Sequence, residues 1–148
     1  VIESAPTAEE TISGPSEYEV MRTNSIAKKN RAIQTKLEKV ISYTKQTMVA
    51  YMSEEDLNRL CTYVAEYSSG DTLQKITPVK VDSQLKSIDI MHFGWNIGKA
   101  FGIKRIHTAT FIKNVFAHTL RDLEIATIER KMSHTESACY ITLDRRIS

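Results

Sequence analysis

The sequence predicts a mainly α fold with a small two-stranded β wing near its C-terminus. Apolar residues recur at spacings of three, four and seven over most of the chain, which is typical of helices that bury one face. No Gly or Pro occurs within residues 19–52, and Gly70 and Gly102 each follow a helical pattern at the place where helices commonly end. Only residues 75–81 and 138–143 have the alternating or β-branched composition of strands.

Residues 1–18 are predicted to be a flexible acidic tail. They contain two prolines and one glycine, have no hydrophobic period, and carry only acidic charges. A segment of this kind buries too little apolar surface to fold. Residues 19–148 are predicted to form one mostly helical domain.

A long helix is predicted over residues 19–52. Its apolar stripe recurs every three, four or seven residues from Ile26 to Tyr51. Residues 20–52 hold seven Lys or Arg against one acidic residue, Glu38, so the helix is basic as well as amphipathic. We expect it to pack on the rest of the domain or to pair with a second copy of the chain as a homodimer.

The next two helices are predicted from their start signals. Ser53 is a typical N-cap, and the three acidic residues after it lie where the helix dipole favours negative charge. The following helix begins at Asp82 or Ser83 and should be the most buried, because its apolar residues spread widely around it. Gly94 and Gly98 lie on one face of that helix and would let a neighbouring helix approach closely.

The last part of the chain is expected to contain two more helices and the β wing. Apolar residues have helical spacing over 108–120, and Asp122 is placed to cap a short helix after them. Residues 75–81 alternate like a strand, although Pro78 restricts such a strand to the edge of a sheet. The composition of residues 138–143 favours a second strand that pairs with it to form the wing.

Several classes of function are disfavoured by what the sequence lacks. Cys61 and Cys139 are not spaced as a metal pair, none of the four histidines has another His or a Cys three or four residues away, and no recognisable ligand set is complete, so we expect no metal and no cofactor. No nucleophile elbow or phosphate-binding glycine loop is present, so we do not expect an enzyme. We expect a cytoplasmic protein without membrane association, because no apolar run is long enough to span a bilayer.

The segment 94–113 resembles the helix-turn-helix of bacterial and phage repressors. In that pattern a small residue in the first helix precedes a turn glycine by four residues, an aliphatic residue follows the glycine, and apolar residues anchor the second helix. The matching residues here are Gly98, Gly102, Ile103, Phe111 and Ile112. The aliphatic residue expected six positions after the turn glycine is Thr108 in this chain. The resemblance covers about 20 of the 148 residues and implies a helix-turn-helix or winged-helix unit over 83–143.

The resemblance and the local charge together predict which side chains contact DNA. Between Lys99 and Arg121 the chain has five Lys or Arg and no acidic residue. Turn residues would contact phosphates, exposed residues of the second helix would contact base edges, and the long helix would supply further phosphate contacts. The predicted contacts are Lys104, Arg105, His107, Thr108, Thr110, Lys113 and Asn114, with Lys28, Lys29 and Arg31 on the long helix; Ala117 is also expected to be exposed.

Two alternatives stay open at this point. In a second register, helix 108–120 positions the unit and helix 123–132 contacts DNA beside the wing; we favour the first register because Glu124 and Glu129 would repel phosphates. The function predicted is DNA binding, as a transcriptional regulator or a phage or mobile-element accessory factor. The alternative function is a helical protein–protein interaction module that does not bind nucleic acid.

Overall fold

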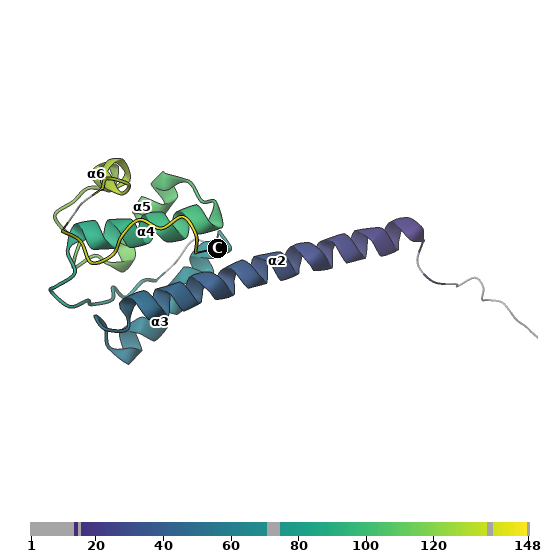
Figure 1. The fold of residues 1–148 in the computed structure, drawn as a ribbon, viewed down its shortest axis with the longest axis horizontal. Helices are drawn as coiled ribbons and strands as arrows, with labels where there is room; N and C mark the ends of the chain where they lie inside the picture. The colour runs from purple at the N-terminus through teal and green to yellow at the C-terminus, as the bar shows by residue number, and fades with distance from the viewer. Residues whose placement is uncertain (1–13, 15, 71–74, 136–137, 148) are drawn as a thin grey trace, which may run out of the picture. The chain divides into compact units, whose positions relative to one another are not determined.

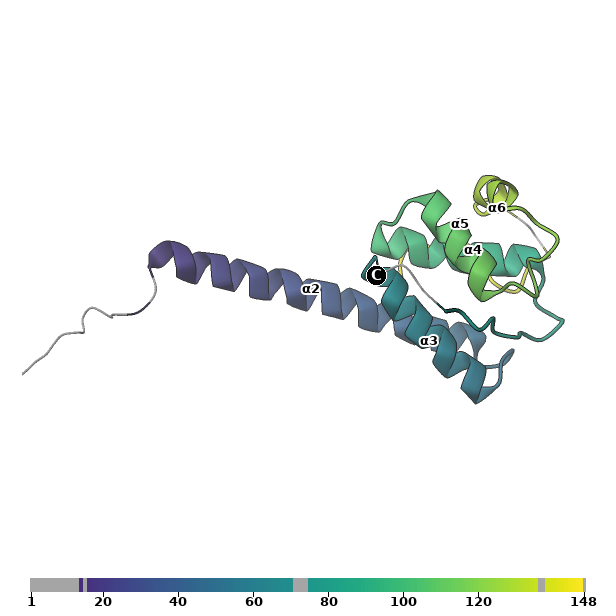
Figure 2. The same ribbon diagram turned by 180° about the vertical axis from the view of Figure 1, so that it is seen from behind.

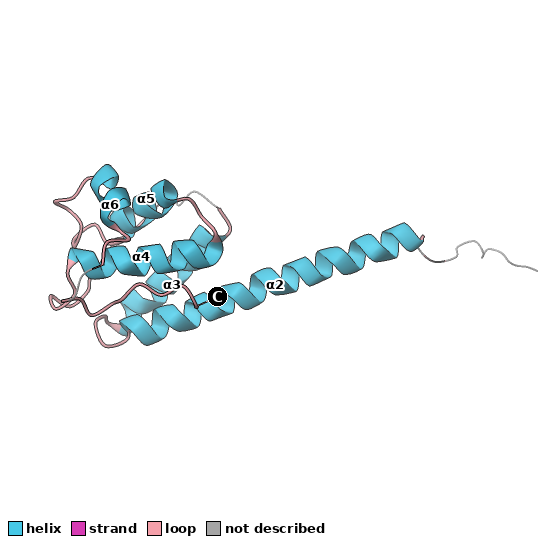
Figure 3. Cartoon of the chain, turned by 45° about the horizontal axis from the view of Figure 1, so that its top comes forward, coloured by secondary structure: helices cyan, strands magenta, loops and turns pink. Residues whose placement is uncertain are grey.

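The computed structural model describes residues 14, 16–70, 75–135 and 138–147. The chain divides into two compact units, Val1–Thr35 and Lys36–Ser148, which we describe separately. The prediction of a mainly α fold is confirmed, and within the described ranges the chain forms helices and loops but no strand (Figure 3). The helices are α2 (Glu17–Met48), α3 (Glu54–Ser68), α4 (Ser87–Phe101), α5 (Arg105–Val115) and α6 (Ile125–Lys131) (Figure 1).

Helix α2 begins at Glu17 and ends at Met48, so the predicted bounds of 19–52 are displaced at both ends. Its start is fixed by a reciprocal pair of hydrogen bonds. The Glu19 backbone N–H donates to Ser16 Oγ at 3.2 Å, and the Ser16 backbone N–H donates to Glu19 Oε1 at 3.3 Å. The last two residues of the predicted tail are therefore helical, whereas residues 1–13 and 15 lie outside the described part of the chain.

The apolar stripe of α2 is exposed in the N-terminal unit and buried in the C-terminal unit. In the N-terminal unit, Ile26 is 42% exposed and Ile33 is 58% exposed, and apart from half-buried Ala27 every described residue from 16 to 35 is exposed. In the C-terminal unit, the same helix buries Val40 and Met48. Burial of the predicted stripe is thus confirmed only for its C-terminal half.

Helix α3 begins as the sequence predicts. The Asp56 backbone N–H donates to Ser53 Oγ at 3.2 Å, which satisfies one of the free N–H groups of the first turn. The helix ends at Ser68, and Gly70 follows in the left-handed region with φ of 81°. Here the N-cap and the stop signal were both predicted correctly, because each depends on neighbouring residues alone.

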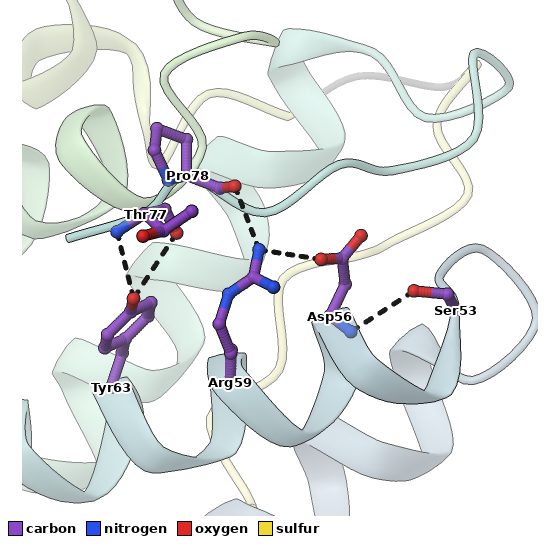
Figure 4. A network of polar contacts seen from close by, with 6 residues as sticks. All are labelled: Ser53, Asp56, Arg59, Tyr63, Thr77 and Pro78. Carbon is purple, nitrogen blue, oxygen red and sulfur yellow. Dashed lines mark hydrogen bonds and ion pairs between the residues drawn. The ribbon is translucent and has the colours of Figure 1, made fainter.

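Helix α3 also holds the segment that was expected to form the first strand of the wing (Figure 4). Arg59 pairs with Asp56 at 2.7 Å and donates to the Pro78 carbonyl at 3.1 Å. The Tyr63 hydroxyl accepts from the Thr77 backbone N–H at 3.0 Å and donates to the Thr77 carbonyl. The backbone groups of this segment are therefore bonded to helix side chains instead of to a strand.

Helix α4 is the most buried element, as predicted. It begins at Ser87, later than the predicted Asp82 or Ser83, and every residue from Asp89 to Gly98 is buried. Three of these buried residues, Asp89, His92 and Asn96, are polar and recur at helical spacing. Buried polar groups need hydrogen-bond partners, and all three find them in the C-terminal segment of the chain.

Residues 138–144 run alongside α4, and they and His134 are bonded to those side chains (Figures 1 and 2). Asp89 Oδ1 accepts the backbone N–H groups of Tyr140 at 2.6 Å and Ile141 at 3.0 Å. The His92 ring nitrogens lie 2.8 Å from the Ile141 carbonyl oxygen and 2.6 Å from that of His134. Asn96 lies further along the segment, where it donates to the Thr142 carbonyl and accepts from the Asp144 N–H.

The predicted β wing is wrong, and these contacts explain why. A strand needs its backbone groups to pair with those of another strand. In segment 138–143, those groups are occupied by side chains of α4, and in segment 75–81 they are occupied by side chains of α3 and by the Val115 carbonyl, which accepts from the Val79 N–H. The strand-like composition instead serves to bury Val79 and Ile141.

Helices α4 and α5 pack closely through two glycines, as predicted. A Cβ atom added at Gly94 would lie 2.8 Å from two methyl carbons of Ile112, and one added at Gly98 would lie 2.5 Å from Thr108 Oγ1. Any side chain at these positions would require α5 or the side chains of Ile112 and Thr108 to shift. Helix α5 also packs against α3 and α6, so it is held on several sides.

The ends of α5 and α6 differ from their predicted positions. Helix α5 spans Arg105–Val115 instead of 108–120, and α6 begins after Glu124, so the predicted cap at Asp122 is wrong. The connection between them is held by the Lys113 ammonium group. Its Nζ donates to three backbone carbonyls, those of Leu120 at 2.7 Å, Arg121 at 3.2 Å and Leu123 at 2.6 Å.

We expect Lys113→Ala to lower the free energy of unfolding by about 1–3 kcal/mol, since charge-assisted hydrogen bonds at partly buried carbonyls are lost. Urea unfolding measures this change, and hydrogen exchange should speed up over residues 116–123. Lys80→Ala is the matched control, because Lys80 is exposed in an irregular segment. Equal stability of the two variants would contradict an anchoring role for Lys113.

Candidate nucleic-acid interface

The connection between α4 and α5 has the length that a helix-turn-helix requires. It consists of three residues, Gly102, Ile103 and Lys104, and Gly102 takes the left-handed conformation with φ of 71°. Helix-turn-helix connections have three or four residues and often contain glycine. The second register would need residues 116–124 as its turn, which is too long, so the geometry favours the first register.

Most predicted contacts around this turn are accessible. Lys104, Arg105, His107 and Asn114 are exposed, whereas Thr110, Lys113 and Ala117 are half-buried. The Lys113 ammonium group already has three carbonyl partners, so all of its donors are in use. On α5, then, the side chains available for base contacts are those of His107 and Asn114, and Thr110 can serve only as an acceptor, because its hydroxyl donates to the Ile106 carbonyl at 2.9 Å.

The predicted exposure of Thr108 is wrong. Its side chain faces Gly98 across the contact between α4 and α5, and the residue is 1% exposed. The Tyr67 hydroxyl donates to Thr108 Oγ1, which in turn donates to the Lys104 carbonyl at 3.2 Å. Burial raises the pKa of Tyr67 to about 12, so this phenol keeps its proton at neutral pH. Thr108 therefore fixes α5 on α3 and α4 and does not reach a ligand.

Arg105 connects the start of α5 to the end of α6. Its guanidinium group donates to Ser133 Oγ at 3.0 Å and to the Glu129 carbonyl at 2.5 Å. The side chain is nevertheless exposed, and a guanidinium group has five N–H donors. Arg105 thus has a fixed position and still has donors for a phosphate oxygen.

A pocket of about 400 Å³ lies at the α4–α5 turn. Three basic residues, Lys99, Lys104 and Arg105, line it together with the apolar side chains of Trp95, Ile103 and Met132. No acidic residue contributes to its lining. The turn therefore combines a recess with a local excess of positive charge.

A fourth cation, Arg145, lies beside this pocket at Trp95. The Arg145 guanidinium carbon is 5.5 Å from the centroid of the Trp95 ring, and the Lys99 ammonium nitrogen is 5.8 Å from it. These are cation–π distances. Neither Lys99 nor Arg145 was predicted as a site residue from the sequence. Lys99 had a signal, since it belongs to the basic run after residue 98, but nothing local relates Arg145 to Trp95.

These cations are not neutralised by neighbouring carboxylates. In the ranges that the structure describes, ion pairs are formed by Arg59 with Asp56 and by Arg121 with Asp122, and none involves a basic residue at the turn. The predicted contacts on α2 belong to the N-terminal unit, where Lys28, Lys29 and Arg31 are all exposed. Lys28 and Arg31 are three residues apart and share one face of the helix, whereas Lys29 lies about 100° around the helix from Lys28.

Other classes of site find no support in the described residues. No group of three or more His, Cys, Asp or Glu residues there could hold a metal ion. Every helix described also falls short of the length and apolar character needed to cross a membrane. No protein-family model, curated protein or solved structure matches the chain.

Proposed function

We propose that this chain binds DNA through the α4–α5 turn and the exposed face of α5. The observation that carries the proposal is the group of cations that line the pocket at the turn, Lys99, Lys104 and Arg105, with no acidic residue in that lining. Arg145 adds a fourth positive charge over the Trp95 ring. Clustered positive charge attracts the phosphate backbone and releases its condensed counterions, which supplies most of the affinity of non-specific binding.

In this proposal the two groups of residues have different tasks. Lys104 and Arg105 contact phosphates and set the orientation of α5 on the duplex. Asn114 pairs with adenine, because an amide offers both a donor and an acceptor, while His107 and Thr110 make single contacts to base edges. Lys28, Lys29 and Arg31 add phosphate contacts that carry no sequence preference. The protein would then serve as a transcriptional regulator or as an accessory factor of a phage or mobile element.

The test is fluorescence anisotropy of a labelled blunt-ended duplex at about 50 and 200 mM salt. We expect the affinity to fall by orders of magnitude over this range, and Lys104→Ala to weaken binding and reduce the salt dependence by about one phosphate contact. Lys80→Ala is the matched control, since it removes the same charge from an exposed site away from the turn. Equal binding by the two variants, or no binding at low salt, would contradict the proposal.

A second candidate function is helix-mediated association with a protein. It rests on the exposed apolar residues of the N-terminal unit, in which Tyr18 is 70%, Met21 64% and Ile33 58% exposed. Such an interface would include pairing of α2 with a second copy of the chain. Because apolar contacts tolerate salt whereas phosphate contacts do not, association that persists at about 200 mM salt would favour this candidate.

A further inference from the structure

We propose that the pocket at the α4–α5 turn binds a nucleotide, with the phosphate on its basic side and the base on its apolar side. The inference rests on the proposed function for the choice of ligand and goes beyond contact with a duplex backbone. A recess of about 400 Å³ lies within the size range of small-molecule sites, whereas backbone contacts need no recess.

The positive charges on the basic side of the pocket favour an anionic ligand. Lys99 and Lys104 are both exposed, and in the described part of the chain neither ammonium group forms an ion pair or a side-chain hydrogen bond. Arg105 is positioned by its bonds to Ser133 and Glu129 and keeps further donors. Because phosphate oxygens accept charge-assisted hydrogen bonds from both types of side chain, a phosphate ester satisfies this side better than a neutral ligand does.

The start of α5 adds to this preference. Lys104 is the N-cap residue and makes no side-chain cap, and its carbonyl accepts from the His107 and Thr108 N–H groups. In the described part of the chain, the N–H groups of Arg105 and Ile106 therefore remain without a hydrogen-bond partner. These groups and the helix dipole favour negative charge at the point where Lys104 and Arg105 line the pocket.

The apolar side of the pocket accommodates a ring. Trp95, Met132 and Ile103 line this side. Trp95 is 8% and Met132 1% exposed, so each presents only a small part of its side chain to the pocket, and half-buried Ile103 is the most accessible of the three. Nucleobases are bound by stacking and by apolar contact with such side chains. A nucleotide combines the two features in one small molecule, because a sugar links its phosphate to a flat aromatic base.

A base within a continuous duplex is stacked and paired, and it would have to leave the duplex, at the cost of that stacking and pairing, to enter the pocket. A free nucleotide, or an unpaired nucleotide at the end of a DNA strand, enters without that cost, and we take these as the ligand. Both sources present the same chemistry, and the experiment has to separate them.

Trp95 is the only tryptophan of the chain and lines the pocket, so intrinsic fluorescence reports directly on occupancy. Deoxyadenosine monophosphate is titrated first, followed by deoxyadenosine, inorganic phosphate, a blunt-ended duplex, and the same duplex with a 5′-phosphorylated overhang. We expect a saturable change with the monophosphate and binding at least about tenfold weaker for the nucleoside, which lacks the charged group. A stronger response to the overhang duplex than to the monophosphate would identify a strand end as the ligand, and the reverse would identify a free nucleotide.

Lys104→Glu should abolish the response, and Lys80→Ala should leave it unchanged; both residues are exposed, so neither change disturbs the core. The inference is overturned if neither the monophosphate nor the overhang duplex changes the fluorescence saturably, or if Lys104→Glu responds like the unmodified chain. Anisotropy of the blunt duplex separates this outcome from the proposed function. Blunt-duplex binding without any nucleotide response overturns only the pocket, and a nucleotide response without blunt-duplex binding overturns only the proposed duplex contact.

Discussion

Asp89→Ala is expected to lower the free energy of unfolding by roughly 3–5 kcal/mol, because it leaves several backbone N–H groups without an acceptor inside the protein. The carboxylate is 1% exposed and accepts three of them, from Lys86 at 2.9 Å, Tyr140 at 2.6 Å and Ile141 at 3.0 Å. The first of these bonds begins α4, and the other two fix the C-terminal segment on it. One side chain thus joins two parts of the chain that are about fifty residues apart.

Urea denaturation measures the loss of stability, and hydrogen exchange at Tyr140 and Ile141 locates it. Asp122→Ala is the matched control, since the Asp122 side chain is 93% exposed and has only a distant ion pair, 3.9 Å from Arg121. We expect that variant to change stability by less than about 0.5 kcal/mol. If Asp89→Ala were as stable as Asp122→Ala, the C-terminal segment would not depend on α4 in the way the hydrogen bonds indicate.

The same contacts show why the helices could be predicted and the wing could not. The cap at Ser53 and the stops at Gly70 and Gly102 depend on residues a few positions away, which the sequence places side by side. The fate of segment 138–143 depends on Asp89 and on other α4 side chains far away in the sequence. Composition indicates that the segment is extended and partly buried, but it does not reveal whether a strand or a helix supplies the partners.

In the candidate site too, features that depend on neighbouring residues could be predicted, and features that depend on distant residues could not. Exposure was predicted correctly for Lys104 from its place in the turn, and for His107 and Asn114 from their place on the second helix. Thr108 was assigned to the wrong face, although it lies three and four residues before Phe111 and Ile112 and therefore shares their buried face. The pocket itself, with Met132 from beyond α6 in its lining, could not be predicted, since it requires the packing of three helices to be known.

Gly98→Ala should destabilise the protein by about 1–3 kcal/mol, although the same change in an ordinary helix interior stabilises it by about 1 kcal/mol. The expected change in stability has the opposite sign here because there is no room for a Cβ atom at residue 98. The new Cβ would lie 2.5 Å from Thr108 Oγ1, 3.1 Å from Thr108 Cγ2 and 3.2 Å from Tyr67 Oη. Atoms do not approach so closely, so α5 must move away from α4 or the bond between Tyr67 and Thr108 must break.

A double-mutant cycle with Thr108→Ala tests that explanation, because this second change removes both Thr108 atoms that Cβ would meet. On its own, Thr108→Ala leaves the buried Tyr67 hydroxyl without its acceptor and should cost about 1–2 kcal/mol. Combined with Gly98→Ala, it should cost less than the sum of the two changes, with a coupling energy of about 1 kcal/mol or more. Additive effects, or a Gly98→Ala variant more stable than the parent chain, would mean that α4 and α5 do not approach each other through Gly98. The three-residue turn and the pocket at its side depend on that approach, so the same measurement also tests the geometry from which both binding proposals proceed.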